Sequence, residues 1–326
     1  MKRFKALACC CMAAACLAMV LSGCSSQQSY TPPEKSPTVA TPTIGKDGTL
    51  RVGVNSASAP LAGMPSSSSK IVGIDVDIAA ALADSLGLKL EIVDVGTDPE
   101  SALKEQKVDI VMGAKQSDDE VKFWKSAPYI STGVALFSTS SNTTVPTKSS
   151  VPKIAAQVSS TSSWQVTNEY GDDSLVPEND LKTAFVDLAA GTVQYVAADA
   201  IIGTYAAHGG GFDAKIVALM QQPGGYCIGV SDANAELKQI ISDAVASLSG
   251  GGIVSVIEAK WLGAPIEVSA VPLTDGAKSA KTNAKTDTAQ GGTADAAKTG
   301  DGNADNTTAA TDGAGENAVE PGSRAA

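Results

Sequence analysis

Residues that could bind a small molecule follow a short apolar run in the first half of the chain. Residues 108–112 (VDIVM) follow a charged helix end and are typical of a buried strand in a parallel sheet, and Gly113 ends the run. In open α/β sheets, ligands bind just beyond the carboxyl ends of such strands. The segment therefore predicts either a ligand-binding loop or an ordinary solvated loop. Its polar side chains are Lys115, Gln116, Ser117, Asp118 and Asp119.

The composition argues against several other kinds of chemistry. The net charge of −11 disfavours nucleic acid as a partner, because nucleic acid needs a basic surface. His208 is the only histidine, so neither a zinc site nor a Ser-His-Asp triad is expected. Cys227 is the only cysteine beyond residue 24, so no intramolecular disulfide is expected, and its apolar neighbours favour an inert thiol. We therefore expect no metal and no cofactor.

The first 24 residues are typical of an export signal. Residues 1–5 are basic, and residues 6–20 are apolar but too short to remain as a spanning helix. Residues 21–24 (LSGC) then resemble the lipobox of bacterial lipoproteins, which implies cleavage before Cys24 and acyl chains such as palmitate on it. Two or three acyl chains anchor a protein stably at ~0.8 kcal/mol per buried methylene. We expect a lipid-anchored chain on the outer face of the cytoplasmic membrane, at the cell surface or in the periplasm.

Both ends of the remaining chain lack the apolar residues that a core needs. Residues 25–46 are rich in Ser, Thr, Pro and Gln, and residues 275–326 contain no aromatic side chain. Ordering a backbone costs ~1–2 kcal/mol per residue, which such segments cannot recover. We therefore expect a lipidated flexible tether over residues 24–48 and a disordered low-complexity tail over residues 266–326.

Strand and helix signals alternate between residues 49 and 263, as in α/β proteins. In the first part this order predicts a mostly parallel sheet with helices on both faces, and the same pattern begins again after residue 150. The expected strands are residues 50–54, 88–93, 108–112, 134–137, 153–157, 193–198 and 226–230, and the expected helices are residues 78–86, 99–106, 159–170, 181–191, 199–207, 236–248 and 254–261.

The two repeats of this pattern predict two lobes of roughly 100 residues, an ordinary domain size. Lobe 1 is expected to comprise residues 49–136 and 229–265, and lobe 2 residues 137–228. The apolar runs at residues 134–137 and 226–230 bracket lobe 2, as two hinge strands would.

Five short segments of this region resemble one family. They are residues 50–54 (LRVGV), 73–79 (GIDVDIA), 107–110 (KVDI), 126–129 (SAPY) and 258–263 (EAKWLG). In this order they look like the extracellular solute-binding proteins, family 3, of polar amino acid ABC importers. The resemblance implies a two-lobed type II periplasmic-binding fold. It also implies that the chain is a monomer that binds a small polar solute between closing lobes and delivers it to an ABC permease in the membrane.

The resemblance places the first half of the ligand site in the loop of residues 114–122. The family holds the ligand carboxylate there with an arginine, whose guanidinium fits both oxygens. That arginine falls on Asp119 or Val121, so only Lys115 or Lys122 could supply a cation. The ligand-binding residues expected in this loop are Ala114, Lys115, Gln116 and Lys122.

Other parts of the family site are altered or retained. In some members of the family an acidic residue binds the cationic side chain of the ligand, and Asn55 stands at that position here. The family's two stacking aromatics fall on Ser58 and near Gly96, so both aromatics are missing. Asn55 and Ser58 are still expected to contact ligand. These departures favour a solute other than an ordinary α-amino acid, either cation-bearing or neutral and polar.

The second half of the expected site opens two helices. Ser160 and Thr161 match a turn whose hydroxyls and free N–H groups hold an anion at a helix start, although an ordinary helix cap would look the same. Asp199 matches the carboxylate that holds a ligand ammonium, and it would equally cap the helix that follows it. One residue can serve both purposes.

Three classes of function are compatible with these residues. The leading hypothesis is a lipid-anchored solute-binding component of an ABC importer, closing about Phe137 and Cys227–Ile228. The alternative is a sensory or scaffold lipoprotein that keeps the fold without transport, which predicts no permease or ATPase gene beside this one. An enzyme such as a dehydratase would need a buried acid or base. Asp119 or Asp199 could serve, but no base partner is evident, so we expect no enzyme.

Overall fold

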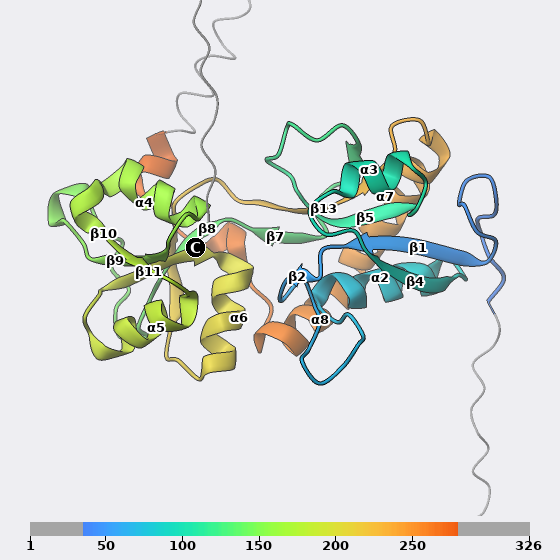
Figure 1. Ribbon diagram of the computed structural model, residues 1–326. Coiled ribbons are helices and arrows are strands. Elements are labelled where there is room, and N and C mark those ends of the chain that lie inside the picture. Colours follow the sequence, from blue (N-terminus) through green and yellow to red (C-terminus); the bar gives the residue numbers. More distant parts are fainter. Residues whose placement is uncertain (1–34, 280–326) are drawn as a thin grey trace, which may run out of the picture. The chain divides into compact units, whose positions relative to one another are not determined.

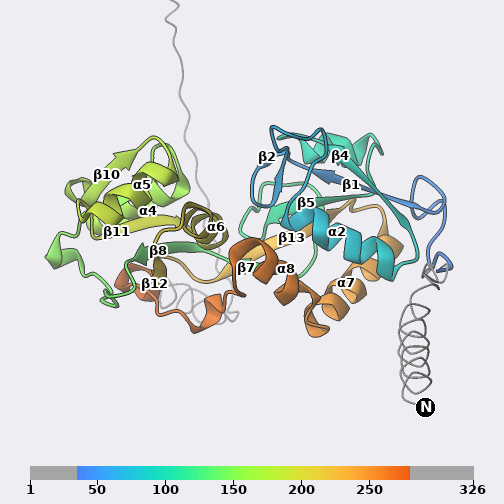
Figure 2. The same cartoon turned by 90° about the horizontal axis from the view of Figure 1, so that it is seen from below.

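The computed structural model describes residues 35–279 of the chain. These residues form an α/β fold with two sheets, each flanked by helices (Figures 1 and 2), which confirms the expected fold class. The sheets are mixed and not mostly parallel as expected, because residues 224–230 and 134–138 run antiparallel to their neighbours. Cys24, with its proposed lipid, and residues 280–326 lie outside the described part, so the expectations for them stay untested.

The first sheet has the strand order β4-β1-β5-β13-β6, with β7 also pairing with β13. Strands β4, β1 and β5 are parallel, and β13 runs antiparallel to β5. Its strands are β1 (Thr49–Val54), β4 (Lys89–Asp94), β5 (Ile110–Lys115), β6 (Trp124–Lys125), β7 (Ile130–Thr132) and β13 (Gly224–Val230).

The alternation of side chains along these strands builds a core on each face of the first sheet. Ile110 and Met112 of β5 belong to the cluster under α2 (Ile74–Ser85), α7 (Ala235–Gly250) and α8 (Ile253–Leu262). Val111, between them, belongs to a smaller cluster with α3 (Pro99–Lys104) on the other face. This two-sided burial explains why residues 108–112 are almost continuously apolar.

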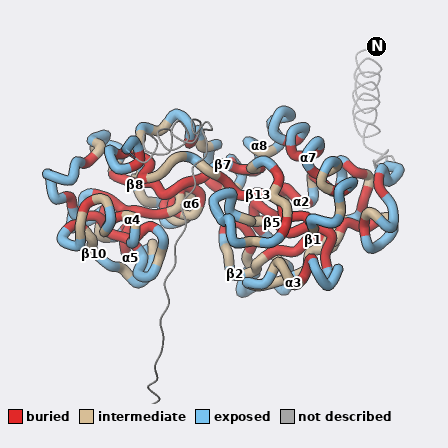
Figure 3. The backbone as a smooth tube through the Cα atoms, turned by 90° about the horizontal axis from the view of Figure 1, so that it is seen from above, coloured by how far each residue is buried: buried red, intermediate tan, exposed pale blue. Residues whose placement is uncertain are grey.

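The second sheet has the order β10-β9-β11-β8-β12, in which β10, β9 and β11 are parallel and β8 is antiparallel to both neighbours. Adjacent residues again divide between two cores. Ala155 packs with α5 and α6, whereas Ile154 and Ala156 pack with α4, and Figure 3 shows the buried strands. The elements are β8 (Val134–Ser138), β9 (Ile154–Gln157), β10 (Leu175–Glu178), β11 (Tyr195–Asp199), β12 (Lys215–Leu219), α4 (Thr161–Tyr170), α5 (Leu181–Ala190) and α6 (Ala200–Gly210).

The chain crosses from one sheet to the other at residue 133, between β7 and β8, and at residues 220–223, between β12 and β13. The expected hinge at Phe137 and Cys227–Ile228 is corrected by this result, because these residues lie inside sheets. Phe137 pairs with residues of β11 and β12, and Cys227 pairs with Ala114. Consequently residues 134–136 lie in the second sheet and residues 224–228 in the first, the reverse of the expected lobe assignment.

Both expected flexible ends are shorter than the composition suggested. Val39 and Ile44, inside the expected tether, are buried in the core of the first sheet. After α8 the chain continues to the second sheet, where Val268, only 1% exposed, joins a core cluster and Leu273 pairs with Leu219 of β12. The expected tail therefore cannot begin at residue 266, since a few apolar residues suffice to dock this segment.

The remaining elements are short. They are β2 (Ala57–Ser58), β3 (Ala62–Gly63) and the 3₁₀ turns η1 (Lys148–Ser150), η2 (Asp172–Ser174) and η3 (Val268–Ala270). Across residues 35–279 no single helix has the length and apolar content to span a membrane; α7 and α8 meet these criteria only together and are bent by 68° at their junction.

Candidate functional site

A cavity of about 330 Å³ lies at the carboxyl ends of strands β1, β4 and β5. Asn55 follows β1 directly, Val95 and Gly96 follow β4, and Ala114 and Lys115 end β5, so the parallel strands deliver all of these residues to one edge of the sheet. The expected site residues Asn55, Ser58, Ala114 and Lys115 line this cavity.

The cavity wall contains a buried acid, Asp75, that was not among the expected site residues. Asp75 is 2% exposed and lines the cavity from the first turn of α2. Gly73 precedes that turn with a φ of +153°, and a Cβ atom there would lie 2.1 Å from the carbonyl oxygen of Leu61. The same carbonyl accepts the Asp75 N–H at 2.9 Å, so the glycine permits the close approach that holds Asp75 in place.

One oxygen of the Asp75 carboxyl has a partner and the other has none. The hydroxyl of Tyr129 donates to Oδ1 and accepts the N–H of Gly113 at 3.0 Å. Within residues 35–279 no group donates a hydrogen bond to Oδ2, which lies 3.1 Å from the position that a Cβ atom at Gly113 would occupy. The φ of +76° at Gly113 and its missing side chain therefore keep space open beside Oδ2.

The surroundings of this pair disfavour ionisation. Burial raises the pKa of Asp75 from 3.8 to about 7, against a smaller lowering by the Tyr129 hydrogen bond. Burial and the neighbouring Asp75 also raise the pKa of Tyr129 well above its usual value. The carboxyl of Asp75 therefore changes between its protonated and its ionised form near neutral pH.

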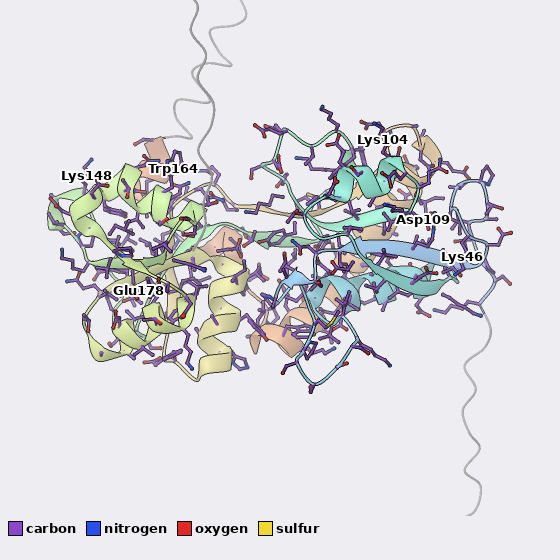
Figure 4. All side chains as sticks on the ribbon, viewed as in Figure 1. Lys46, Lys104, Asp109, Lys148, Trp164 and Glu178 are labelled. Carbon is purple, nitrogen blue, oxygen red and sulfur yellow. The ribbon has the colours of Figure 1, made fainter. Side chains whose placement is uncertain are left out.

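Two expected residues of the same loop lie outside the cavity lining. Gln116 donates its backbone N–H to the carbonyl of Gly225 at 2.9 Å, which ties the end of β5 to β13. Lys122 lines a separate surface hollow of about 810 Å³ at the opposite ends of the strands, together with Lys104 and Asp109, which Figure 4 labels. Two largely buried charges of that hollow are already paired, because Asp109 binds the guanidinium of Arg51 at 2.6 Å.

The loop of residues 114–122 contributes both apolar and charged side chains to the cavity. Val121, one of the two positions expected for the family arginine, lines the cavity, whereas Asp119 does not. Among the residues that line the cavity in the described part of the chain, Lys115 is the only cation. Lys115 is therefore the one side chain there that can neutralise a carboxylate.

Ser160 and Thr161 lie in the second sheet's half, at the start of α4. The Ser160 hydroxyl accepts the N–H of Ser163 at 3.1 Å and donates to the carbonyl of Gln157 at 2.6 Å, so it caps the helix. Thr161 is exposed, as is Trp164, 65% exposed and labelled on α4 in Figure 4. The capping geometry is thus present, while an anion at this turn stays a prediction.

Asp199 caps α6 and ties it to the strands that cross between the sheets. Its Oδ1 accepts the N–H groups of Ile201 and Ile202 at 2.9 and 3.1 Å. Its Oδ2 accepts the hydroxyls of Thr132 and Tyr226 at 2.8 and 3.1 Å. Burial raises its pKa, against lowering by these four hydrogen bonds. Since a carboxylate accepts about four hydrogen bonds, Asp199 has no free position for a ligand ammonium in this arrangement.

A signal for Asp75 was present in the sequence. Asp75, Ile78, Ala79 and Leu82 occupy positions i, i+3, i+4 and i+7 of α2, and all four are buried. The acid therefore lies on the apolar stripe of its own helix, whereas Asp77 points to α8, where it accepts from the Trp261 indole at 2.7 Å. No comparable signal pointed to Tyr129, Tyr226 or Thr132, whose partners lie far away in the sequence.

Comparisons with known proteins agree with this architecture. The family of bacterial extracellular solute-binding proteins, family 3, matches residues 50–264. The L-cystine-binding protein TcyJ of Escherichia coli (strain K12) is 24% identical over 239 residues, which cover 68% of this chain and 86% of that protein.

Two solved structures share the fold. One is a polar amino acid ABC uptake transporter substrate binding protein from Streptococcus thermophilus, with a TM-score of 0.59 and 17% identity over 71% of this chain and 90% of that one. The other is the L-cystine solute receptor of Neisseria gonorrhoeae in the unliganded open conformation. Its TM-score is 0.58, and it is 22% identical over 68% of this chain and 95% of that one. The chain belongs to the bacterial extracellular solute-binding proteins of family 3.

Proposed function

We propose that this protein is the lipid-anchored, extracytoplasmic solute-binding component of an ABC importer and that it takes up a small polar solute of the amino acid class. The observation that carries the proposal is the cavity at the carboxyl ends of β1, β4 and β5, in a chain of family 3. The related proteins named above bind L-cystine or serve polar amino acid uptake.

The chemistry of the cavity supports an amino acid or a compound like it. Its volume of about 330 Å³ suits a small solute, and its lining combines apolar side chains with Asn55, Ser58, Lys115 and the carboxyl of Asp75. Lys115 can hold a carboxylate as a point charge, in place of the family's arginine. The cavity thus offers one cation and one buried acid to a zwitterion.

The second half of the site is proposed at the start of α4. The hydroxyl of Thr161 and the helix N-terminus are free to meet a ligand held in the cavity, if the two halves close on it. Closure is favoured only by contacts that the ligand makes to both halves. The proposed anchor is Cys24, which would tether the binding region outside the membrane.

A ligand screen with the purified chain tests the proposal. The thermal unfolding midpoint is measured against amino acids and their derivatives, because a ligand at 100 times its Kd adds ~2.7 kcal/mol of stability. We expect at least one to bind, and we expect Lys115→Met to weaken it by ~10–150-fold, the effect of losing a hydrogen bond to a charged group. Lys104→Met, in the separate hollow, should leave the affinity unchanged.

Two outcomes would contradict the proposal. If no amino acid or derivative stabilises the chain, the solute-binding role is wrong. If a solute binds but the ligand-bound protein never stimulates a membrane ABC transporter from the same source, the transport role is wrong and the sensory alternative gains support.

A further inference from the structure

We propose that the solute carries a positively charged nitrogen, an ammonium or a guanidinium, and that the Asp75 carboxyl binds it through Oδ2 in the cavity. This inference rests on the proposed function and names the side chain that binds the positive nitrogen of the solute. Asp75 lies outside the set of ligand residues that the family resemblance assigned, and it faces the cavity from helix α2 rather than from a loop.

The geometry supplies an acceptor without a donor. A carboxyl accepts several hydrogen bonds, and an oxygen that reaches a cavity can accept them from a ligand. Asp75 as a whole is 2% exposed, and Ser174 Oγ is the only fully buried side-chain polar atom without a partner in the described residues, so Oδ2 still reaches the cavity. Oδ1 of Asp75 has the Tyr129 hydroxyl, while Oδ2 has no donor anywhere in residues 35–279. Gly113 leaves the space next to Oδ2 open on the cavity side. A donor group on a ligand would supply the missing hydrogen bond to Oδ2.

The charges around Asp75 leave room for a cation. None of the ion pairs in the described region involves Asp75; Lys260 of α8 pairs with Asp77 instead, at 2.6 Å. The titratable groups that face Asp75 are Tyr129, which donates a hydrogen bond to it, and Tyr226 of β13, whose pKa is raised in part by the charge of Asp75.

The rest of the cavity adds little competing positive charge. Lys115 and Asp118 are the other charged groups in its lining, and no hydrogen bond from α7, β1 or β4 reaches the Asp75 carboxyl in residues 35–279. The cavity therefore holds two acids and one lysine, a balance that suits a solute with at least one positive nitrogen. Since burial raises the pKa of Asp75 to about 7, the carboxyl can ionise at neutral pH when a cation arrives.

Isothermal titration of the purified chain tests this with matched solutes. L-Arginine, L-lysine and L-cystine are titrated first. L-Arginine is then compared with L-citrulline, which lacks the positive side-chain charge, and with 5-guanidinovalerate, which lacks the α-ammonium, so the two comparisons show which nitrogen the protein binds. A side-chain contact predicts a large loss with citrulline, and an α-ammonium contact predicts a large loss with guanidinovalerate. If neither nitrogen matters for a solute that binds, the proposed contact is wrong.

The pH dependence provides a readout that a structural role would not give. We expect the Kd of the bound solute to fall about tenfold per pH unit from pH 5 to 6 and to level off above pH 7. In wild-type protein at pH 6, titrations in two buffers of different ionisation enthalpy should detect release of ~0.9 proton per solute bound, and close to none at pH 8.5.

Variants separate this proposal from the general function. Asp75→Asn should weaken binding at pH 8 at least about tenfold and remove the pH dependence, because the amide cannot become charged. Asp77→Asn, the same change two residues further along α2, should leave both unchanged. Solute binding that is insensitive to Asp75→Asn and releases no proton overturns this inference but not the solute-binding role; absence of any binding overturns both.

Discussion

The buried acid of the cavity should make the stability of the unliganded protein fall as the pH rises. The pKa of Asp75 is 3.8 when the group is exposed in the unfolded chain and about 7 in the folded protein. Below pH ~4 the group is protonated in both states and contributes nothing. Between pH ~4 and ~7 only the unfolded state releases the proton, so unfolding becomes easier, and above pH ~7 the loss is complete.

The size of the effect follows from the same two values. A difference of about three pH units is worth ~4 kcal/mol, at ~1.36 kcal/mol per unit. Burial raises the pKa of Glu258 to about 7 as well, so the wild-type slope contains more than one group. The useful quantity is therefore the difference in unfolding free energy between wild type and Asp75→Asn, because Glu258 contributes equally to both.

Urea unfolding at pH 4, 5.5, 7 and 8.5 measures this difference. We expect Asp75→Asn to gain ~4 kcal/mol relative to wild type between pH 4 and pH 8.5. Tyr129→Phe provides a check on the sign: its hydroxyl lowers the pKa of Asp75, so its removal should move the transition to higher pH. A relative gain below ~1 kcal/mol would show that water or movement screens the carboxyl and would refute the burial argument.

Four further substitutions test other contacts of the fold, each by urea unfolding and one by NMR as well. Asp109→Ala leaves a largely buried guanidinium unpaired and should cost ~3–5 kcal/mol, and a cost below ~1 kcal/mol would contradict the pairing seen here. Gly73→Ala should cost at least ~1–3 kcal/mol because its Cβ meets a carbonyl oxygen, whereas Gly209→Ala, in a helix with open space, should gain ~0.5–1 kcal/mol. Tyr226→Phe should lower the free energy of unfolding by ~1–3 kcal/mol and raise the pKa of Asp199, because it removes the hydroxyl that donates to this carboxylate. Carboxyl ¹³C NMR measures that pKa, and an unchanged value would contradict the hydrogen bond.

The regular elements could be predicted well because their signals are local. Helices α4, α5, α7 and α8 lie within two residues of the expected ranges, since apolar spacing and caps such as Asp180 and Asn234 mark them. Strands β10 and β12 were not expected. Leu175–Glu178 contains a proline and is not fully buried, and β12 follows a glycine-rich turn, so neither has a strong pattern of its own.

The site was predictable only in part, for a physical reason. Lys115 could be expected at a site because it follows a buried strand, whereas Asn55, Ser58 and Ala114 were expected only from the family resemblance; all four line one cavity. Partners across long sequence separations could not be foreseen. The hydroxyl that meets Asp75 lies 54 residues away, and the hydroxyls on Asp199 lie 67 and 27 residues away.

The segment after α8 changes what counts as the folded unit. Strand β12 is at the edge of its sheet, and Leu219 both donates its N–H to Pro272 and accepts the N–H of Thr274, at 2.8 and 2.9 Å. The similarity to the family ends at residue 264, so a protein cut there would lose this cover. Unpaired strand edges recruit other strands, and such a shortened protein would be prone to self-association through β12.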